Sequence, residues 1–249
     1  MYFRQNLRTP GVLNIFTDSG FDKDIYDIYV SFPGFVAVTT KEGVDYVIGD
    51  GVKQIENSTS NNGEINAISM GIDFAIQNKD KYEYINLFSD SQYCVNSLRE
   101  WIFKWINCKK KKYNEDTGAE YIDLCNSTKS SVENQSEFLT VIKKIIDNDL
   151  NICIYHVKGH VSNTPDSLQM AHSLFCKSNY FDPNLISLDD IGYISYYNNM
   201  VDGLGSDLKS YYSLQGTKEK VVSQCYYQGL DFNKYSKLLN LDMLKKKGE

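Results

Sequence analysis

VLNIFTD (residues 12–18) and YINLFSD (residues 84–90) share one pattern, in which a short apolar run ends in a polar residue and an aspartate. Apolar runs of this length, stopped by turn-forming residues, are typical of buried strands. Ligands and catalytic groups gather where the strands of an open α/β sheet end. The two stretches therefore predict two strands of one sheet with Asp18 and Asp90 at its functional edge, although either carboxylate alone would more often be a helix cap.

The rest of the chain predicts a mixed α/β fold. Residues 35–40 and 46–48 are β-branched and aromatic and flank Lys41-Glu42-Gly43, which indicates a hairpin, and residues 151–157 form another strand. Four segments have helical periodicity: residues 63–78, 91–105, 132–147 and 198–211. The order of elements predicts an α/β fold with a mixed five-stranded sheet, three antiparallel leading strands plus two further strands, flanked by helices.

Composition bounds the class of protein. The chain has 249 residues, of which 42% are hydrophobic and 23% are charged. Soluble globular proteins have about 45–50% and about 25%, so a disordered or fibrous chain is excluded. No apolar run reaches the roughly 18 residues of a membrane span, and the N-terminus lacks the apolar stretch of a secretion signal. We expect no membrane partner.

Cysteine usage and charge bear on location and partners. The cysteines are scattered and include no C-x-x-C pair: Cys94, Cys108, Cys125, Cys153, Cys176 and Cys225. This favours reduced thiols and a cytoplasmic location, which would be the host cytoplasm for a viral protein. The net charge of −6 and the pI near 5.2 argue against binding nucleic acid through the overall field, but a local basic patch remains compatible with them.

Four acids lie on four different predicted elements: Asp18, Glu64, Asp90 and Asp202. Glu64 is expected in the first turn of helix 63–78, where the helix dipole favours a carboxylate. Asp202 lies in an apolar helical stripe, where a carboxylate is costly unless it is paired or binds a cation. Four carboxylates converging on one sheet end would form a site for hard divalent cations, for which Mg²⁺ is the common choice.

Five motifs give the chain its resemblance to type 1 ribonuclease H, an RNase H-like family. They are Ile15-Phe16-Thr17-Asp18, Thr59-Ser60-Asn61-Asn62-Gly63-Glu64, Ser89-Asp90-Ser91-Gln92-Tyr93, Val157-Lys158-Gly159-His160 and Asn198-x-x-x-Asp202-x-Leu204. The resemblance covers roughly residues 12–160 and 197–212. It implies a catalytic RNase H-like domain over residues 1–215 with an insertion at 161–197, followed by a tail at 216–249 with one short candidate helix at 231–244.

The resemblance also implies roles for individual residues. Asp18, Glu64, Asp90 and Asp202 would bind two Mg²⁺ ions, which Mn²⁺ would replace, and His160 would assist proton transfer and product departure. Substrate contacts are implied for Thr59, Asn61, Gln92, Trp101, Lys104, Trp105, Lys109, Lys110, Lys111 and Lys112. The tryptophans and lysines of this set correspond to a basic protrusion that grips the DNA strand in many bacterial members. Without the resemblance, the lysine run would be a solvated loop and the tryptophans core residues of one helix face.

The function that the resemblance implies is that of a monomeric endoribonuclease that cuts the RNA strand of RNA–DNA hybrids by a two-metal-ion mechanism. A replication protein is a further partner that the sequence leaves open. Two alternatives stay open: a non-catalytic nucleic-acid-binding domain on the same fold, and a metal-dependent DNA junction nuclease or exonuclease. Two departures from the family motivate the first of these, the acidic stretch FDKDIYD at residues 21–27 and the insertion, while retention of all four acids speaks against it.

Two further features depart from the family. Gly63 stands where the family usually has a larger residue, and the insertion separates His160 from the helix that carries Asp202. Residues 166–177 predict a helix with Pro165 in its first turn, and residues 180–197 an ordered loop. Because both ends of the insertion lie near the expected site, we expect it to wall the substrate groove and restrict His160, with a surface flap as the alternative.

Overall fold

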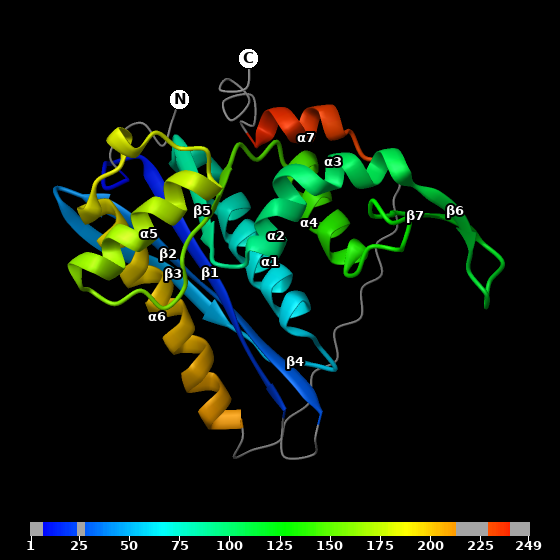
Figure 1. The fold of residues 1–249 in the computed structure, drawn as a ribbon, viewed down its shortest axis with the longest axis horizontal. Coiled ribbons are helices and arrows are strands. Elements are labelled where there is room, and N and C mark those ends of the chain that lie inside the picture. The colour runs from blue at the N-terminus through cyan, green and yellow to red at the C-terminus, as the bar shows by residue number, and fades with distance from the viewer. Residues whose placement is uncertain (1–6, 24–27, 213–228, 240–249) are drawn as a thin grey trace.

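A mixed sheet organises the molecule, for which the computed structural model describes residues 7–23, 28–212 and 229–239 (Figure 1). Its strands are β1 (Val12–Lys23), β2 (Tyr29–Lys41), β3 (Val44–Val52), β5 (Tyr84–Ser89) and β8 (Cys153–His156), in the order β3-β2-β1-β5-β8. The first three are antiparallel, whereas β5 and β8 run parallel to β1. The predicted fold class is confirmed, and the two-residue strand β4 (Ile55–Glu56) adds a short pairing to β2.

The two strands that carry the first and third acids end differently. β5 stops at Ser89, one residue after the predicted end, but β1 continues past its predicted end at Thr17 because β2 pairs with it as far as Lys23. The parallel pairing of β1 with β5 nevertheless ends at Thr17↔Ser89. Between β2 and β3 the chain turns in two residues, Glu42 and Gly43, both with positive φ, as a tight hairpin with right-handed twist requires.

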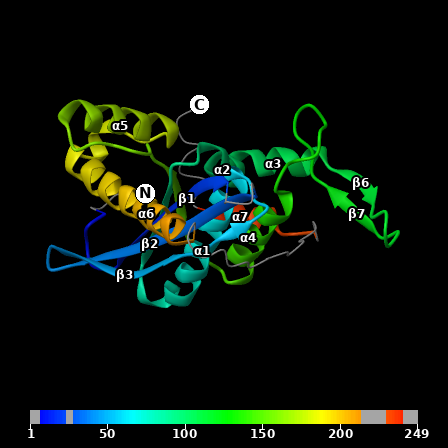
Figure 2. The ribbon, with the colours of Figure 1, turned by 90° about the horizontal axis from the view of Figure 1, so that it is seen from below.

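Helices cover both faces of the sheet. One face is covered by α1 (Ser60–Asn78), the short η1 (Lys79–Lys81), a helical stretch at 92–108, α4 (Gln135–Asp147) and α7 (Phe232–Leu238). The other is covered by α5 (Pro165–Ser178), η4 (Pro183–Leu185) and α6 (Leu188–Tyr212). Alternate residues of β1 serve the two cores, since Leu13 and Ile15 face the first and Phe16 the second. Figure 2 shows α5 and α6 close together, at a distance from α4.

The helical stretch at 92–108 contains an irregularity. It consists of α2 (Gln92–Asn96), a π-helical turn η2 (Ser97–Trp101), α3 (Ile102–Trp105) and η3 (Ile106–Cys108). It leads into a two-stranded hairpin, β6 (Lys110–Tyr113) and β7 (Glu120–Asp123), which projects from the body (Figures 1 and 2). The lysine run is therefore a strand of a protrusion rather than a loop.

Two helices begin earlier than the sequence predicts. α1 starts at Ser60, because the Thr59 side chain accepts a hydrogen bond from the Asn62 backbone at 3.1 Å and caps the helix. Glu64 thus lies in the second turn, and its predicted first-turn place is wrong. α6 starts at Leu188, so the predicted loop over residues 188–197 is wrong as well. Its tyrosine-rich composition suggested a loop, but the rings of Tyr193 and Tyr197 are buried against the sheet.

The C-terminal helix packs on the first core. Asp231 caps α7 by accepting from the backbone of Asn233 and Lys234, and Tyr235 is fully buried with its hydroxyl donating to the Leu98 carbonyl at 3.0 Å. The helix begins as predicted, and its predicted end at residue 244 lies outside the described residues. In the described parts of the chain, no helix combines the length and hydrophobicity that a bilayer span requires. No disulfide joins any of the five cysteines that the structure describes.

The insertion forms much of the second core. Ala171 and Phe175 of α5 and Ile191 and Ile194 of α6 lie in one buried cluster with residues of the sheet. Phe175 is 5.8 Å, between ring centroids, from Tyr155 of β8. A surface flap would not contribute such residues, so these contacts favour the insertion as a layer of the fold.

We expect Phe175→Ala to lower the free energy of unfolding by about 3–5 kcal/mol, because Phe175 is 0% exposed and its loss leaves a cavity between α5 and the sheet. Met170→Ala on the same helix is the matched control, since its side chain is 63% exposed and its loss should change stability by no more than about 0.5 kcal/mol. Denaturant unfolding measures both. Equal midpoints for the two variants would show that α5 does not belong to the core.

Candidate active site

Three of the four predicted acids meet at one end of the sheet. Oxygens of Asp18, Glu64 and Asp90 all lie within 4.8 Å of one another, and we call these three side chains the acidic cluster. Asp18 and Asp90 each directly follow the last parallel pair, Thr17↔Ser89, so strand register places them side by side. This convergence is what the two strand-end motifs predict.

Glu64 reaches the cluster because α1 crosses the sheet very closely. A Cβ on Gly63 would lie 2.6 Å from the Cβ of Ser31 and even nearer the hydroxyl of Ser19. No larger side chain fits between α1 and the strands at this point. The departure from the family at Gly63 is therefore matched by small residues on β1 and β2, and it allows the next residue to enter the cluster.

The fourth acid approaches from the opposite face of the sheet. Asp202 on α6 lies outside the group within 4.8 Å, but its charge acts on the carboxyls of both Asp18 and Asp90. Its side chain is 38% exposed. The distance from Oδ2 of Asp202 to Nδ1 of His160 is 3.4 Å. A close approach of α6 at Gly205 to the backbone of Gly20 and Phe32 sets this position.

His160 stands at the solvent side of the site. Its side chain is 77% exposed, and its backbone has a positive φ of 51°. The next residue is held in place, because Asn199 of α6 donates from Nδ2 to the Val161 carbonyl at 2.9 Å. The imidazole therefore projects from an anchored turn while its Nδ1 faces Asp202.

Burial and mutual repulsion dominate the electrostatics of the acidic cluster. Burial, then the charge of Asp90, raises the pKa of Asp18 to about 7. Burial, then the charges of Asp18 and Asp90, raises the pKa of Glu64 well above its ordinary value. Burial also raises the pKa of Asp90, against the opposing effects of His160 and of a hydrogen bond from Asn198. The described residues thus concentrate negative charge without a buried cation to balance it.

The donor set fits a hard divalent cation. Carboxylate oxygens are the ligands that Mg²⁺ prefers, and the cluster offers three of them within reach of one another. In addition, Oε2 of Glu64 is buried and has no hydrogen-bond partner among the described residues. Such an oxygen is costly unless something binds it, and a cation would do so.

Asp90 is held on three sides by residues of the neighbouring elements. A Cβ on Gly159 would collide with Oδ2 of Asp90, so only glycine allows this approach. Asn198 of α6, itself buried, hydrogen-bonds the carboxylate, and His156 of β8 lies with Nε2 3.2 Å from the Asp90 backbone carbonyl. Sequence reasoning assigned no role to His156, although a histidine inside the apolar strand NICIYHV was a signal.

The polar residues predicted to contact substrate lie at the starts of α1 and α2. Thr59 is the exposed cap of α1, Asn61 lies in its first turn, and Gln92 is the exposed first residue of α2. A contact of 3.8 Å from Sγ of Cys94 to the Asn61 carbonyl joins the starts of the two helices. Asn61 and Gln92 therefore lie within three residues of Glu64 and Asp90 in the chain, and the side chains of Thr59 and Gln92 are exposed.

The tryptophans and lysines divide into core and protrusion. Trp105 is only 7% exposed and packs with its ring centroid 5.8 Å from that of Phe138, and Trp101 is half-buried beside it. Trp105 is therefore a core residue, as its spacing alone suggested. Lys104, Lys109, Lys110 and Lys111 are exposed and Lys112 is half-exposed.

Carboxylates of the protrusion neutralise part of its lysine run. Lys111 pairs with Glu120 at 2.8 Å, and Lys112 pairs with the buried Asp123 at 2.7 Å. Lys110 donates instead to the Lys129 backbone carbonyl at 2.6 Å. This contact involves no carboxylate, so it does not neutralise the charge of Lys110. The basic character of the protrusion is smaller than the sequence suggests.

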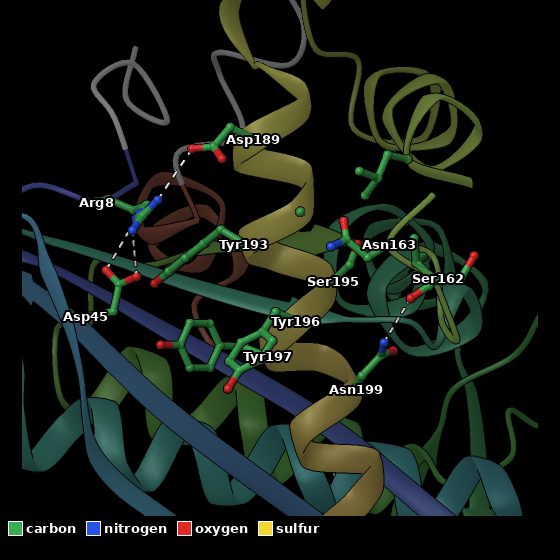
Figure 3. A pocket seen from close by; sticks show the side chains of 13 residues that line it. Arg8, Asp45, Ser162, Asn163, Asp189, Tyr193, Ser195, Tyr196, Tyr197 and Asn199 are labelled. Atoms are coloured by element: carbon green, nitrogen blue, oxygen red, sulfur yellow. Dashed lines mark hydrogen bonds and ion pairs between the residues drawn. The ribbon is translucent and has the colours of Figure 1, made fainter. Parts of the chain in front are cut away.

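A groove of about 400 Å³ runs beside the site, along the outer face of α6 (Figure 3). At one end of the groove, Arg8 forms ion pairs with Asp45 and Asp189. The ring of Tyr193 faces the guanidinium, with 5.5 Å between its centroid and Cζ of Arg8. Asn163 lines the other side. None of the four predicted metal-binding carboxylates lines it, so the groove adjoins the candidate site without containing it.

Fold and site together define a mixed α/β protein with a carboxylate cluster, suited to a cation, where parallel strands end. The family model for RNase H matches residues 10–175, so the chain belongs to the RNase H family and the predicted family is confirmed. The match includes Asp18, Glu64, Asp90 and His160 and ends before Asp202. No curated protein matches this chain.

Solved structures with a similar fold have low sequence identity. The foamy viral protease-reverse transcriptase in complex with RNA/DNA hybrid is 15% identical with a TM-score of 0.46, over 68% of this chain and 20% of that chain. The RNase H domain of PFV is 17% identical with a TM-score of 0.43, over 68% of this chain and 94% of that domain. LC9-RNase H1 is 14% identical with a TM-score of 0.42, over 68% and 74% of the two chains.

The raised pKa of Asp18 predicts a pH dependence of stability. Because the folded state binds this proton more tightly than the unfolded chain, whose aspartates have a pKa near 3.9, the metal-free protein should lose about 1.4 kcal/mol per pH unit between about pH 4 and pH 7. Asp18→Asn should make this loss smaller, although Glu64 and Asp90 still contribute through their own raised pKa values, whereas Asp80→Asn, an exposed aspartate at the other end of the sheet, should leave it unchanged. Unfolding curves measured across this pH range in a chelator test it, and parallel profiles for all three proteins would contradict it.

Proposed function

We propose that the protein is an endoribonuclease that hydrolyses the RNA strand of RNA–DNA hybrids, with two Mg²⁺ ions held by Asp18, Glu64, Asp90 and Asp202. One observation carries the proposal: in a member of the RNase H family, three carboxylates share a buried cluster in which one oxygen of Glu64 has no described partner. Divalent ions bound there would activate the attacking water and stabilise the leaving 3′ oxygen.

The chain's own residues would hold and orient these groups. The carboxylates need to be ionised to bind metal, and a bound cation would favour the charged form that burial now disfavours. His160 would accept and release a proton at Nε2, because its Nδ1 faces Asp202 and its side chain is largely exposed. Asn61 and Gln92 would contact the hybrid, in which hydrogen bonds to 2′-hydroxyls distinguish RNA from DNA, and Thr59 would contact a phosphate.

A cysteine nucleophile does not compete with this proposal. Sγ of Cys176 lies 3.9 Å from Nε2 of His172, but burial raises the pKa of this thiol and so disfavours the reactive thiolate. The same Nε2 is 3.0 Å from the Ile186 carbonyl, to which it donates when it carries the proton. With its Nε2 proton directed to a carbonyl, His172 has no acceptor nitrogen facing the thiol.

Three further properties belong to the same proposal. We expect Mn²⁺ to replace Mg²⁺, because both prefer oxygen ligands. We expect a monomer to be active, since all four carboxylates come from one chain, and we propose the cytoplasm as the location. The exposed lysines of the protrusion would contact the DNA strand through its phosphates.

Cleavage of a labelled RNA–DNA hybrid tests the proposal. The wild-type protein should cut the RNA strand only with Mg²⁺ or Mn²⁺, and Asp90→Asn should reduce turnover at least about 10³-fold while it keeps hybrid binding, because it removes a metal ligand and preserves shape. Asp80→Asn is the matched control and should retain turnover.

Matched duplex RNA, duplex DNA and a DNA junction decide among the alternatives in the same assay. Binding of the hybrid without any cleavage would indicate the non-catalytic domain. Cleavage of the junction or of DNA ends in preference to the hybrid would indicate the DNA nuclease. Near wild-type turnover of Asp90→Asn in Mg²⁺ would overturn the metal assignment.

The lysine pairs predict unequal contributions to binding. Lys110→Ala should flatten the salt dependence of hybrid affinity by up to about 0.9 units of logarithmic slope, since its charge is free to meet a phosphate. Lys112→Ala should change this slope less and destabilise the protrusion instead, because Asp123 would lose its ion pair. Hybrid binding over a salt series, measured in the inactive Asp90→Asn background, checks both. Identical slopes for the two variants would show that pairing within the protrusion does not matter.

A further inference from the structure

The outer edge of strand β8 is closed by one side chain of the insertion. Asn179, which follows the last residue of α5, accepts from the His156 backbone N–H at 2.9 Å and donates to the His156 carbonyl at 2.7 Å. Its carboxamide thus replaces a neighbouring strand at the edge of the sheet. Asn179 is fully buried, so these backbone groups are removed from water and depend on it.

The same carboxamide joins a third element. Arg99 of the π-helical turn η2 donates from Nη1 to Oδ1 of Asn179 at 2.7 Å, and the arginine is 3% exposed. Its Nε and Nη2 have no hydrogen-bond partner among the described residues, so Asn179 supplies its side-chain hydrogen bond there. Three elements of separate parts of the chain, α5, β8 and η2, are therefore fixed to one another at this point.

His156, whose backbone Asn179 binds, contacts the backbone of one residue of the acidic cluster. Nε2 of His156 lies 3.2 Å from the Asp90 carbonyl, and because a carbonyl only accepts, Nε2 carries the proton. The ring is buried, and this burial lowers its pKa. Its Nδ1 is buried without a described partner, so the hydrogen bond to Asp90 is the polar contact that the ring makes in the described structure.

The position of Asp90 is sensitive to this contact. Asp90 directly follows β5, where Ser89 is the register partner of His156, so its backbone leaves the sheet beside the imidazole. Its carboxylate is then confined by Gly159 and Asn198. A shift of the Asp90 carbonyl would therefore move the carboxylate relative to Asp18 and Glu64.

We propose that His156 is a positioning residue for Asp90, and that the insertion acts on the acidic cluster through Asn179 and His156. The inference rests on the proposed function of the cluster as a metal site. In this arrangement Asn179 fixes the position of the β8 edge, His156 fixes the position of the Asp90 backbone, and the Asp90 carboxylate binds the metal. Outer contacts of this kind hold ligands in place, and their loss typically weakens metal binding about 10–100-fold.

Metal affinity of three variants at position 156 tests the first half, with Mn²⁺ as the probe in titration calorimetry. His156→Phe keeps ring size and removes the donor, so Mn²⁺ should bind about tenfold more weakly. His156→Gln keeps an N–H that can reach the Asp90 carbonyl and should bind more tightly than His156→Asn, whose amide is too short. If His156→Phe does not fold, the Gln and Asn variants decide alone.

His172→Phe is the matched control. Its Nε2 lies 3.0 Å from the Ile186 carbonyl, so the same kind of bond is lost from the same insertion but away from the cluster. Its Mn²⁺ affinity should equal that of the wild type even if its melting temperature falls. Folded His156→Phe with wild-type Mn²⁺ affinity, or equal affinities of the Gln and Asn variants, would overturn the positioning role.

A double-mutant cycle tests the path from the insertion. Asn179→Asp keeps the acceptor for Arg99 and for the His156 N–H but loses the donor to the His156 carbonyl, so Mn²⁺ should bind more weakly. If the effect passes through His156, Asn179→Asp should cost no further affinity in the His156→Phe background. Additive losses would overturn the path. A wild-type protein that binds no Mn²⁺ would overturn the proposed function and this inference with it, whereas the outcomes above leave the proposed function standing.

Discussion

Repulsion among three carboxylates, of which Asp18 and Glu64 are buried and Asp90 is half-buried, is the constraint to which the rest of the structure responds. Strand register puts Asp18 and Asp90 next to each other, and the close crossing of α1 adds Glu64. Like charges in a low-dielectric site raise one another's pKa, as they do here for Asp18, and such a site persists only if its surroundings hold it rigidly. The small residues at Gly63 and Gly159 are part of this rigidity, because each lets a neighbouring element approach the cluster more closely than any other residue would.

The insertion adds helices to the second face of the sheet, beside the acidic cluster. Its helix α5 and the first turns of α6 complete the core on the second face of the sheet, next to Phe16 and Phe88. α6 then continues to Asp202, so the cluster receives Glu64 from one face and the charge of Asp202 from the other. A helix anchored by so much apolar burial is a firm base for a ligand, whereas a loop would not be.

Charge is distributed unevenly over the molecule. The body is acidic overall, and its lysine-rich protrusion neutralises Lys111 and Lys112 internally. An acidic protein gains little from long-range attraction to nucleic acid, so recognition of a hybrid would rest on local contacts near the cluster and on Lys110, which contacts a backbone carbonyl and not a carboxylate. The groove along α6 adds no positive field, since Arg8 is held between Asp45 and Asp189.

Sequence alone determined the sheet, the family and the three acids of the acidic cluster, because apolar runs that end in aspartate report strand ends locally for Asp18 and Asp90, and the motif around Glu64 adds the third acid. It could not place the start of α6, since tyrosines at 193 and 197 suit a loop until the sheet buries them. Nor could it separate Trp105, a core residue, from the exposed Lys104 beside it in the chain. The link from Asn179 through His156 to Asp90 was decided by tertiary structure only, because it joins residues from three distant segments whose contact depends on how α5 packs against the edge of β8.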